Sequence, residues 1–300
     1  MTEATYQAVK DTAESMPKGR RFSVRGVLNK IGVSASGYYD WLKREPSEQE
    51  RRKQRIKELI KKIHADSHFI YGAPKITQIL RGMGEKISER TVSIYMKELG
   101  IRACWVKPYT VTTISKDFSD NLKNVLKREF DPNEPNAVCC TDITYLWTDE
   151  GFLYLSCIMD LFSRRIIAWE LSRTLETEHV LRAIEKAEFR NVGVKPKIIH
   201  TDRGVQYTSD LYRNCLTGVE LSYSGKGNPW DNACIESFHS LIKREWLNRF
   251  IIRDYDHAYN LVFEYIDAFY NTRRIHSHCN YLSPFEYEKN YYRQIIKAAA

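Results

Sequence analysis

The sequence predicts an all-α region followed by a mixed α/β domain. Apolar residues recur at three- and four-residue intervals up to about residue 100, whereas residues 137–171 hold short apolar and β-branched runs. Charge changes as well: residues 1–130 carry 26 Lys and Arg against 15 Asp and Glu, and residues 131–300 carry 20 against 23, which together give the net charge of +8. A Pro-, Asn- and acid-rich connector at residues 128–136 marks the change.

Composition excludes several classes of protein. With 43% hydrophobic residues, a chain of 300 residues can bury a sizeable core, in two or more units. It has no run of 18 apolar residues, and residues 1–21 lack the apolar segment of a signal peptide, so we expect a cytoplasmic protein with no membrane partner. The seven cysteines form no C-x-x-C pair, which favours buried reduced thiols over a zinc site or a disulfide framework.

The first half contains two helix-turn-helix patterns, in residues 1–50 and 51–103. In the first, apolar residues at helical spacing precede a turn at Gly32, and Ser34 is a good N-cap for the next helix. The second follows a Lys/Arg-dense helical run and pairs "APKITQILRGMG" with "SERTVSIYMKELG". Two such patterns on a basic half favour duplex DNA, with Arg25 and Lys43 as candidate contacts, although solvated helix faces alone would explain the charge equally well.

A linker at residues 104–135, with one short helix in "NLKNVLKREF", is expected to join this half to the α/β domain. Three runs then predict an antiparallel meander, followed by a helix, a fourth strand that pairs with the first, a helix and a fifth strand. We place this core at residues 136–250 and a helical extension at 251–300. The predicted strands of the meander cover residues 137–147, 152–162 and 165–171; the later elements are "ETEHVLRAIEKAEFR", "KPKIIHTD", "SDLYRNCLTG", "VELSYS", "WDNACIESFHSLIKREWLNR" and "RDYDHAYNLVFEYIDAFYNTRR".

Three carboxylates stand out in this domain. Asp142 lies inside the first predicted strand and Asp202 ends the fourth, so neighbouring strands would bring both acids to one edge of the sheet. Two anions so placed repel each other unless protons or cations intervene, which argues for a metal. Glu236 lies on the predicted long helix, and oxygen ligands of this kind suit Mg²⁺. An ordinary surface acid is the alternative for Glu236. Glu236 shares one polar face of this predicted helix with Asn232, His239 and Lys243.

These acids lie within "TDITY", "HTDRGVQYTS" and "GNPWDNACIESFHSLIKRE", which resemble the signature blocks of the D,D-E integrase core in OrfB-type transposases of bacterial insertion sequences. This branch is related to retroviral integrases. The resemblance continues in "YNTRRIHSHCNYLSPFEY", "GVSASGYYDWLKRE" and "YGAPKITQIL", and so covers nearly the whole chain. It implies an RNase H-like core in which Asp142, Asp202 and Glu236 are the catalytic residues and bind two Mg²⁺ ions, which Mn²⁺ can replace.

The resemblance also implies metal-dependent 3′-end cleavage and strand transfer. The partners it implies are double-stranded DNA, as terminal repeats and as target, and further copies of the chain. Lys243 matches a basic position near the reacting phosphate. The sequence departs from the family pattern at Cys139, where tryptophan is expected, at His239, where phenylalanine is more usual, and in the 34 positions from Asp202 to Glu236, a slightly tight spacing. These departures concern packing and substrate preference.

Other polar residues are weaker candidates. We expect Arg203, Gln206 and Tyr207 to face DNA with Asn232 and His239. Asn271, Arg274 and His276 are expected either to contact phosphates or only to cap a helix. Asp160 is expected to cap a turn rather than to bind metal. His200 either supports the site or packs in the core. Gly204 is expected to permit a turn, and Gly225 and Gly227 to mark a mobile loop.

Two alternatives to a transposase remain at this point. A catalytically silent DNA-binding protein or transposition inhibitor would keep the basic region but lose an acid, and all three acids are present. An RNase H-like nuclease or junction resolvase would share the fold and metals, but it would not explain two helix-turn-helix patterns. The sequence therefore favours the enzyme.

Overall fold

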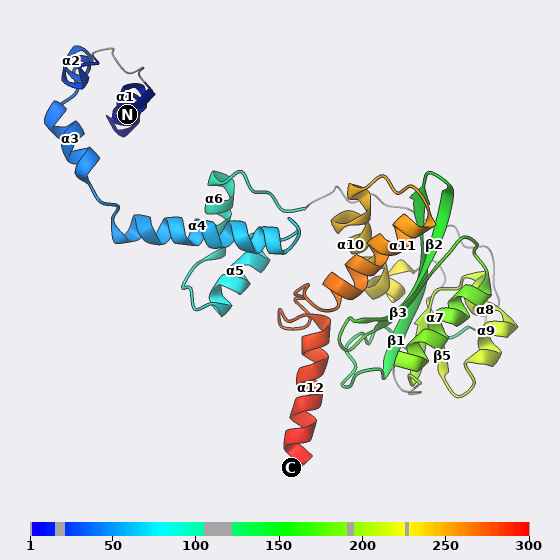
Figure 1. Cartoon of the computed structure of the whole chain (residues 1–300). Coiled ribbons are helices and arrows are strands. Elements are labelled where there is room, and N and C mark those ends of the chain that lie inside the picture. Colours follow the sequence, from blue (N-terminus) through cyan, green and yellow to red (C-terminus); the bar gives the residue numbers. More distant parts are fainter. Residues whose placement is uncertain (1, 16–21, 105–121, 191–194, 226–227, 300) are drawn as a thin grey trace. The chain divides into compact units, whose positions relative to one another are not determined.

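The computed structural model describes residues 2–15, 22–104, 122–190, 195–225 and 228–299 (Figure 1). The chain divides into two compact units, Met1–Leu59 and Ile60–Ala300, which are described separately. Among the described residues, no helix is long and apolar enough to cross a membrane.

The first unit is a small helical cluster. It contains α1 (Thr2–Ser15), α2 (Val24–Lys30), α3 (Ala35–Lys43) and the beginning of α4 (Glu48–Asp66). Tyr6, Val9, Leu28 and Tyr38 form its buried core. Ser34 caps α3 by accepting a hydrogen bond from the Gly37 N–H at 3.2 Å. The helix-turn-helix predicted here is present as α2 and α3, and α1 is an additional helix that the sequence analysis did not anticipate.

The second predicted helix pair is also present, as α5 (Ala73–Gly82) and α6 (Glu89–Glu98). Ser88 caps α6 by accepting from the Thr91 N–H at 3.1 Å. The short helix expected in residues 121–130 is wrong, because residues 122–130 adopt no helix. The backbone N–H groups of Val125 and Leu126 instead donate to Ser222 Oγ, both at 3.0 Å, which holds this segment against the sheet.

A five-stranded mixed sheet forms the centre of the second unit, in the order β3-β2-β1-β4-β5. The first three strands pair antiparallel, and β1, β4 and β5 pair parallel. Both the predicted meander and the predicted pairing of the fourth strand with the first are confirmed. The strands are β1 (Val138–Thr148), β2 (Gly151–Asp160), β3 (Ile166–Ser172), β4 (Ile198–Thr201) and β5 (Glu220–Tyr223).

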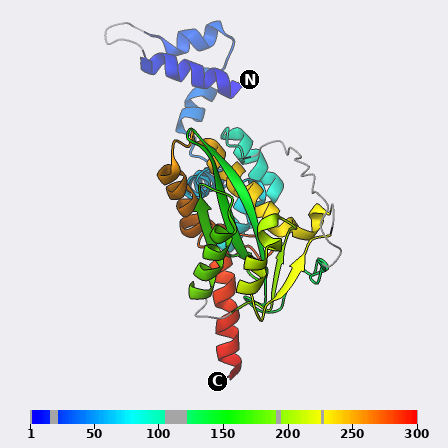
Figure 2. The same ribbon diagram turned by 90° about the vertical axis from the view of Figure 1, so that its right-hand side faces the viewer.

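Helices lie on both sides of this sheet (Figures 1 and 2). On one side are α7 (Thr177–Arg190), α8 (Val205–Thr208) and α9 (Asp210–Cys215), and their side chains share a buried core with Cys139 and Ile199 of β1 and β4. On the other side, α10 (Ala233–Glu245) packs on β1, and α11 (Tyr255–Phe263) contacts β3, where Tyr255 OH donates to the Leu171 carbonyl at 2.9 Å. Successive strand residues point to opposite faces, so Asp142, three residues after Cys139, belongs to the α10 side.

Two helix predictions need correction. The long helix expected at residues 230–249 is a 3₁₀ turn, an α-helix and a second 3₁₀ turn; the break between the last two lies at Trp246, which leaves the helical conformation at φ −135° and ψ −70° and whose ring packs 5.1 Å from that of His68. The last predicted helix changes from α11 to a π-helix. The remaining elements are the 3₁₀ turns η1 (Pro229–Asn232) and η2 (Leu247–Arg249), the π-helix η3 (Glu264–Tyr270) and the terminal helix α12 (Pro284–Ala299).

Candidate active site

The register of β1 and β4 brings Asp142 and Asp202 together. Thr141 and Thr201 are the last residues paired between these parallel strands, and the two aspartates are the next residue on each. Because in-register residues of parallel strands point to the same face, the two carboxylates lie side by side where β4 ends. Burial first, and the negative charge of Asp142 second, raise the pKa of Asp202 to about 6.

Gly204 supports this arrangement of Asp202 by its small size. Its N–H donates to Asp202 Oδ1 at 2.8 Å, and a Cβ atom at this position would lie only 3.0 Å from the same oxygen. The φ angle of Gly204 is −59°, a value open to any residue, so the close approach to Asp202, and not a left-handed backbone, favours glycine after the strand. The glycine provides space for a carboxylate rather than an unusual turn.

Glu236, on the first turns of α10, interacts with both aspartates. Burial and then the charges of Asp142 and Asp202 raise its pKa, although its side chain is exposed to solvent. Within the described parts of the chain, no three His, Cys, Asp or Glu side chains are grouped closely enough to hold a metal. The three acids are therefore near enough to repel one another, but they do not form a preformed three-ligand cluster.

Apart from the exposed Glu236, the polar face of α10 is covered: Asn232 and His239 are buried and Lys243 is half-buried. His239 Nδ1 lies 3.4 Å from Asp142 Oδ2, and its Nε2 is buried without a partner. Asn232 is also buried, and neither atom of its amide has a partner. The expected DNA contacts of these two residues do not fit their burial. Lys243 lies over the ring of Tyr145, 4.5 Å from its centroid, and burial outweighs the charge of Asp142 to lower its pKa.

A cavity of about 180 Å³ opens where β1 and β4 separate. The side chain amide of Gln206 donates to the Leu175 carbonyl at 3.1 Å, and the Tyr207 ring is buried beside Thr141. Both residues were expected to face DNA, but they form the wall of the cavity instead. The lining residues are Asp142, Ile143, Thr144, Tyr145, Tyr154, Leu175, Asp202, Gly204, Gln206 and Tyr207.

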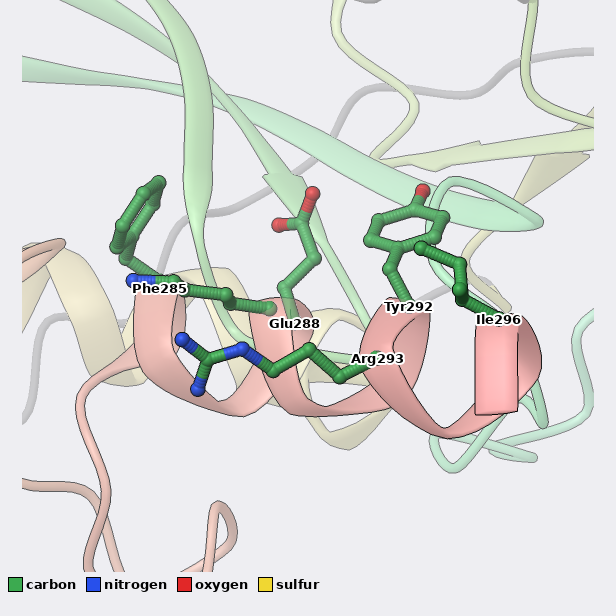
Figure 3. Close-up of a pocket in the computed structure, with 6 residues that line it drawn as sticks. Phe285, Glu288, Tyr292, Arg293 and Ile296 are labelled. Carbon is green, nitrogen blue, oxygen red and sulfur yellow. The ribbon is translucent and has the colours of Figure 1, made fainter. Parts of the chain in front are cut away.

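A second hollow, of about 380 Å³, lies along one face of α12 (Figure 3). Phe285, Tyr292 and Ile296 give it an apolar lining, and its carboxylate, Glu288, is already paired with Arg165 at 3.1 Å. It contains none of the three candidate acids. The acidic cavity is therefore the better candidate for the chemistry.

Arg203 has a structural role next to Asp202. Its guanidinium donates to the backbone carbonyls of Ser224 at 2.8 Å and Leu122 at 3.1 Å, so it ties the end of β4 to two neighbouring segments. The Gly225 N–H donates to Asp231 Oδ2 at 2.8 Å. Gly227, expected in a mobile loop, lies outside the described residues.

The terminal block corrects the expectation for Arg274. This residue is buried, and its guanidinium donates twice to the Glu245 carboxylate, at 2.7 Å each, while Tyr265 OH donates to the same carboxylate at 2.7 Å. It therefore stabilises the interior and does not contact phosphate. Glu245 was not predicted as a buried residue, although a carboxylate on the same helical face as Phe238 and Ile242 indicates a buried partner.

Two titratable neighbours of this ion pair, His276 and Lys75, are half-buried. Burial, followed by the nearby cations Arg274 and Lys75, lowers the pKa of His276 to about 3. Burial and Arg274 lower the pKa of Lys75, on α5, to about 7, and Glu245 opposes this shift. Asn271 is the C-cap residue of η3, with its N–H donating to the Ile266 carbonyl at 3.0 Å, and its side-chain amide pairs with both backbone groups of Ile166, at 3.0 and 2.9 Å.

The remaining candidates are settled by their hydrogen bonds. Asp160 accepts from the N–H of Ser163 at 2.8 Å and the N–H of Asn136 at 2.9 Å, which confirms the predicted turn cap. His200 is fully buried between Ser222 and Ser224, at 2.8 and 3.2 Å, and burial lowers its pKa to about 4. It is a packed core histidine.

Comparison with known families gives the class of the protein. Two models described as "Integrase core domain" match residues 132–229 and 217–284, and one described as "HTH-like domain" matches residues 51–109. Together with the mixed sheet and its adjacent acids, these matches define an integrase-core enzyme with a helix-turn-helix region, which confirms the predicted fold class.

Whole-length relatives then give the family. The chain is 34% identical over 273 residues to "Transposase InsF for insertion sequence IS3A" of Escherichia coli (89% of this chain, 94% of the relative). It is 35% identical over 248 residues to "Transposase for insertion sequence element IS904" of Lactococcus lactis (82% of this chain, 98% of the relative). The chain belongs to the IS3 family of insertion-sequence transposases, of the InsF/OrfB type, and is a DDE-type phosphoryl-transfer enzyme.

A solved structure of "the HTLV-2 integrase catalytic core domain in complex with magnesium" is 16% identical and has a TM-score of 0.42, covering 52% of this chain and 98% of that one.

Proposed function

We propose that Asp142, Asp202 and Glu236 are the catalytic acids with which this transposase cuts and joins DNA strands. The observation that carries the proposal is the in-register placement of Asp142 and Asp202 at the point where β4 ends. Burial first, and the charge of the neighbouring Asp142 second, raise the pKa of Asp202 to about 6, which is the cost of keeping its carboxylate in this site. Such a cost is typical of functional sites.

A divalent cation would relieve this repulsion. The donors are carboxylate oxygens, which suit Mg²⁺, with Mn²⁺ as a substitute, and the family chemistry leads us to propose two ions. When bound, the metal activates the attacking oxygen and stabilises the leaving one. Asp142 and Asp202 would hold it, Glu236 would supply a third carboxylate, and His239 Nδ1, 3.4 Å from Asp142, would help to hold that carboxylate in place.

The reaction proposed is an in-line displacement at phosphorus. In the first step, a water oxygen bonds to phosphorus at the end of the element, the bond from phosphorus to the 3′ oxygen breaks, and the leaving oxygen takes a proton to become a 3′-OH. In the second, this 3′-OH attacks a phosphodiester of the target and releases the adjoining strand with a new 3′-OH. No covalent bond to the protein is required.

DNA binding is assigned to the basic helical regions and to Lys243. Arg25, Lys43 and Lys243 are proposed to contact phosphates of the terminal repeats or the target. Two element ends have to meet for joining, so we propose that further copies of the chain assemble on the DNA. The reaction is placed in the bacterial cytoplasm, on the nucleoid.

The test compares Asp202→Asn with Asp210→Asn, an exposed acid eight positions further along the chain. Cleavage and joining of terminal-repeat DNA are measured in Mg²⁺ and Mn²⁺, together with DNA binding. Asp202→Asn should lose at least about 10³-fold in rate, because several kcal/mol of metal-derived stabilisation disappear at about 1.4 kcal/mol per tenfold. Its binding should stay near that of the unmodified protein, and Asp210→Asn should be fully active.

Two results would count against the assignment. Full joining activity in Asp202→Asn would remove this residue from the chemistry. If the unmodified protein bound the repeats but cut nothing in either metal, the catalytically silent DNA-binding protein would be the correct alternative.

A further inference from the structure

The hairpin of β1 and β2 exposes three aromatic side chains beside the acidic cavity. Tyr145 is 48% exposed, Trp147 65% and Phe152 49%. Trp147 is directly opposite Phe152, and Tyr145 is directly opposite Tyr154, so the rings share one face of the hairpin. We call Tyr145, Trp147 and Phe152 the aromatic face.

The rings meet edge to face and not in a closed stack. Trp147 and Phe152 have centroids 4.8 Å apart with an interplanar angle of 76°, and Tyr145 and Phe152 are 5.5 Å apart at 85°. Cross-strand aromatic pairs add only about 0.2–1 kcal/mol to a hairpin. A T-shaped contact also leaves ring faces open to a further aromatic partner. Hairpin stability alone is therefore a weak reason to expose so much aromatic surface.

The hairpin is held in place by other contacts. Thr148 Oγ1 donates to the Gly151 carbonyl at 2.8 Å across the turn, and the Asp149 N–H donates to the Ile252 carbonyl at 2.9 Å. Leu146 and Leu153, paired on the opposite face of the hairpin, are buried. The hairpin that carries the aromatic face is therefore held in place by contacts that do not involve the three rings.

Position and charge indicate what this face binds. Tyr145 lines the same cavity as Asp142 and Asp202, and Lys243 lies 4.5 Å from the centre of its ring. A cation that follows a nucleic-acid backbone, together with aromatic rings on which bases stack, is the usual arrangement for binding a single strand. Tyr145 therefore joins the aromatic face to the rim of the cavity, while Trp147 and Phe152 lie further along the hairpin, on the face of the strands opposite to Asp142.

The open ring faces favour an unpaired base over a paired one, because a base inside a duplex is already stacked on both sides by its neighbours. Tyr145 and Trp147 are two residues apart on one strand, or about 7 Å at ~3.4 Å per residue. Successive bases in duplex DNA are about 3.4 Å apart along one strand. Neighbouring bases could each meet a ring only if they were drawn apart from the duplex stack.

We propose that the aromatic face of the hairpin binds an unpaired base of the DNA strand next to the phosphate that enters the acidic cavity. Trp147, which is the most exposed, supplies the main stacking surface, and Lys243 holds the backbone between that base and the acids. The inference rests on the proposed function for the location of the reacting phosphate. It adds to that function a preference for DNA whose end is opened.

The test measures binding in an Asp202→Asn background, without metal, so that no cutting occurs. The probes are two synthetic versions of one terminal-repeat duplex, one fully paired and one with three unpaired nucleotides at its end, each with 2-aminopurine as the terminal base. Trp147→Ala should bind the opened duplex about 10-fold more weakly, the size of one lost base stack, and the paired duplex within about 2-fold. The fluorescence quenching of 2-aminopurine should be lost with it.

Two variants separate stacking from simple apolar contact. Trp147→Phe should retain most of the binding and quenching, whereas Trp147→Leu should behave like Trp147→Ala. Phe263→Ala, an exposed aromatic on α11, is the control and should change neither probe. Equal losses on both probes, or normal binding by Trp147→Leu, would overturn the proposal. A change in sedimentation of the DNA-free Trp147→Ala protein would overturn it too, by showing a contact between copies of the chain.

The outcome is separable from that of the proposed function. If Asp202→Asn proved active, the catalytic assignment would fail while the binding results still decided the stacking proposal. If Trp147→Ala bound the opened duplex normally, the stacking proposal would fail and the acids would keep their role.

Discussion

The two ends of α10 carry two glutamates with opposite surroundings. Glu245, at the end of the helix, accepts two hydrogen bonds from Arg274 and one from Tyr265, all at 2.7 Å. Burial alone would raise its pKa, but these bonds and the charge of Arg274 bring it below its usual value. Glu236, near the start, is close to Asp142 and Asp202, and its pKa is raised.

The comparison shows two uses of buried or half-buried charge in one layer of the protein. At the Glu245 end every acid oxygen is satisfied, so the charge fixes how the terminal block packs on the core. At the Glu236 end the fold holds three carboxylates close together, which costs free energy through repulsion and lost solvation. A bound cation would offset this cost. The paired carboxylate of Glu245 therefore stabilises the fold, whereas the unpaired carboxylates around Glu236 form the candidate active site.

The largest expected effect on stability comes from breaking the ion pair between Arg274 and Glu245. Arg274→Ala leaves Glu245 buried without its cation, which should reduce the free energy of unfolding by about 3–5 kcal/mol. Urea unfolding followed by fluorescence measures this loss. Arg273→Ala, at the exposed neighbouring position, is the matched control and should change stability by no more than about 0.5 kcal/mol.

The opposite result would restore the interpretation from sequence. If Arg274→Ala unfolded at the same urea concentration as Arg273→Ala but bound DNA poorly, Arg274 would be a phosphate contact after all.

The contrast between these two ends also explains what could be read from sequence. Asp142 and Asp202 were predictable because each interrupts an apolar strand, and the pairing of those strands follows from the order of the elements. Arg274 was misassigned because its partner, Glu245, is 29 positions away and only the packing of the terminal block brings them together. Local patterns do not contain contacts of that range.

The burial of polar side chains next to the acids could not be predicted from the sequence either. Gln206, Tyr207, Asn232 and His239 are polar or half-polar residues next to the acids, and their composition alone suggests a DNA-facing surface. The structure buries all four. The break at Trp246 was missed for a similar reason, since helical spacing continues through it and only its ring contacts reveal the change.

A smaller effect on stability should come from removing the charge of Asp202. The pKa of Asp202 is about 6 in the folded protein and 3.8 ordinarily, so the folded state favours the protonated acid. The stability that this group contributes is present below about pH 4 and is lost as pH rises through about 6, by up to roughly 3 kcal/mol. Without metal, Asp202→Asn should therefore be more stable than the unmodified protein at pH 8, by about 1–3 kcal/mol, and equally stable near pH 4.

Urea unfolding at several pH values, with and without Mg²⁺, measures this difference. Asp210→Asn should show no such pH dependence, and Mg²⁺ should reduce the advantage of Asp202→Asn because it stabilises only the protein that keeps the carboxylate. An advantage that is the same at pH 4 and pH 8 would mean that Asp202 and Asp142 do not repel each other in the folded protein.

The smallest effect concerns charges that are neither buried nor crowded. Arg25 and Lys43 are exposed on the first unit, so removing either should leave stability nearly unchanged. If each neutralises one phosphate, Arg25→Ala or Lys43→Ala should make the slope of log K against log salt less steep by about 0.9. Fluorescence anisotropy with a terminal-repeat duplex at several salt concentrations measures the slope, with Lys297→Ala on α12 as the control. A slope identical to that of the control would confine DNA binding to the second unit, which contains most of the HTH-like match and all three acids.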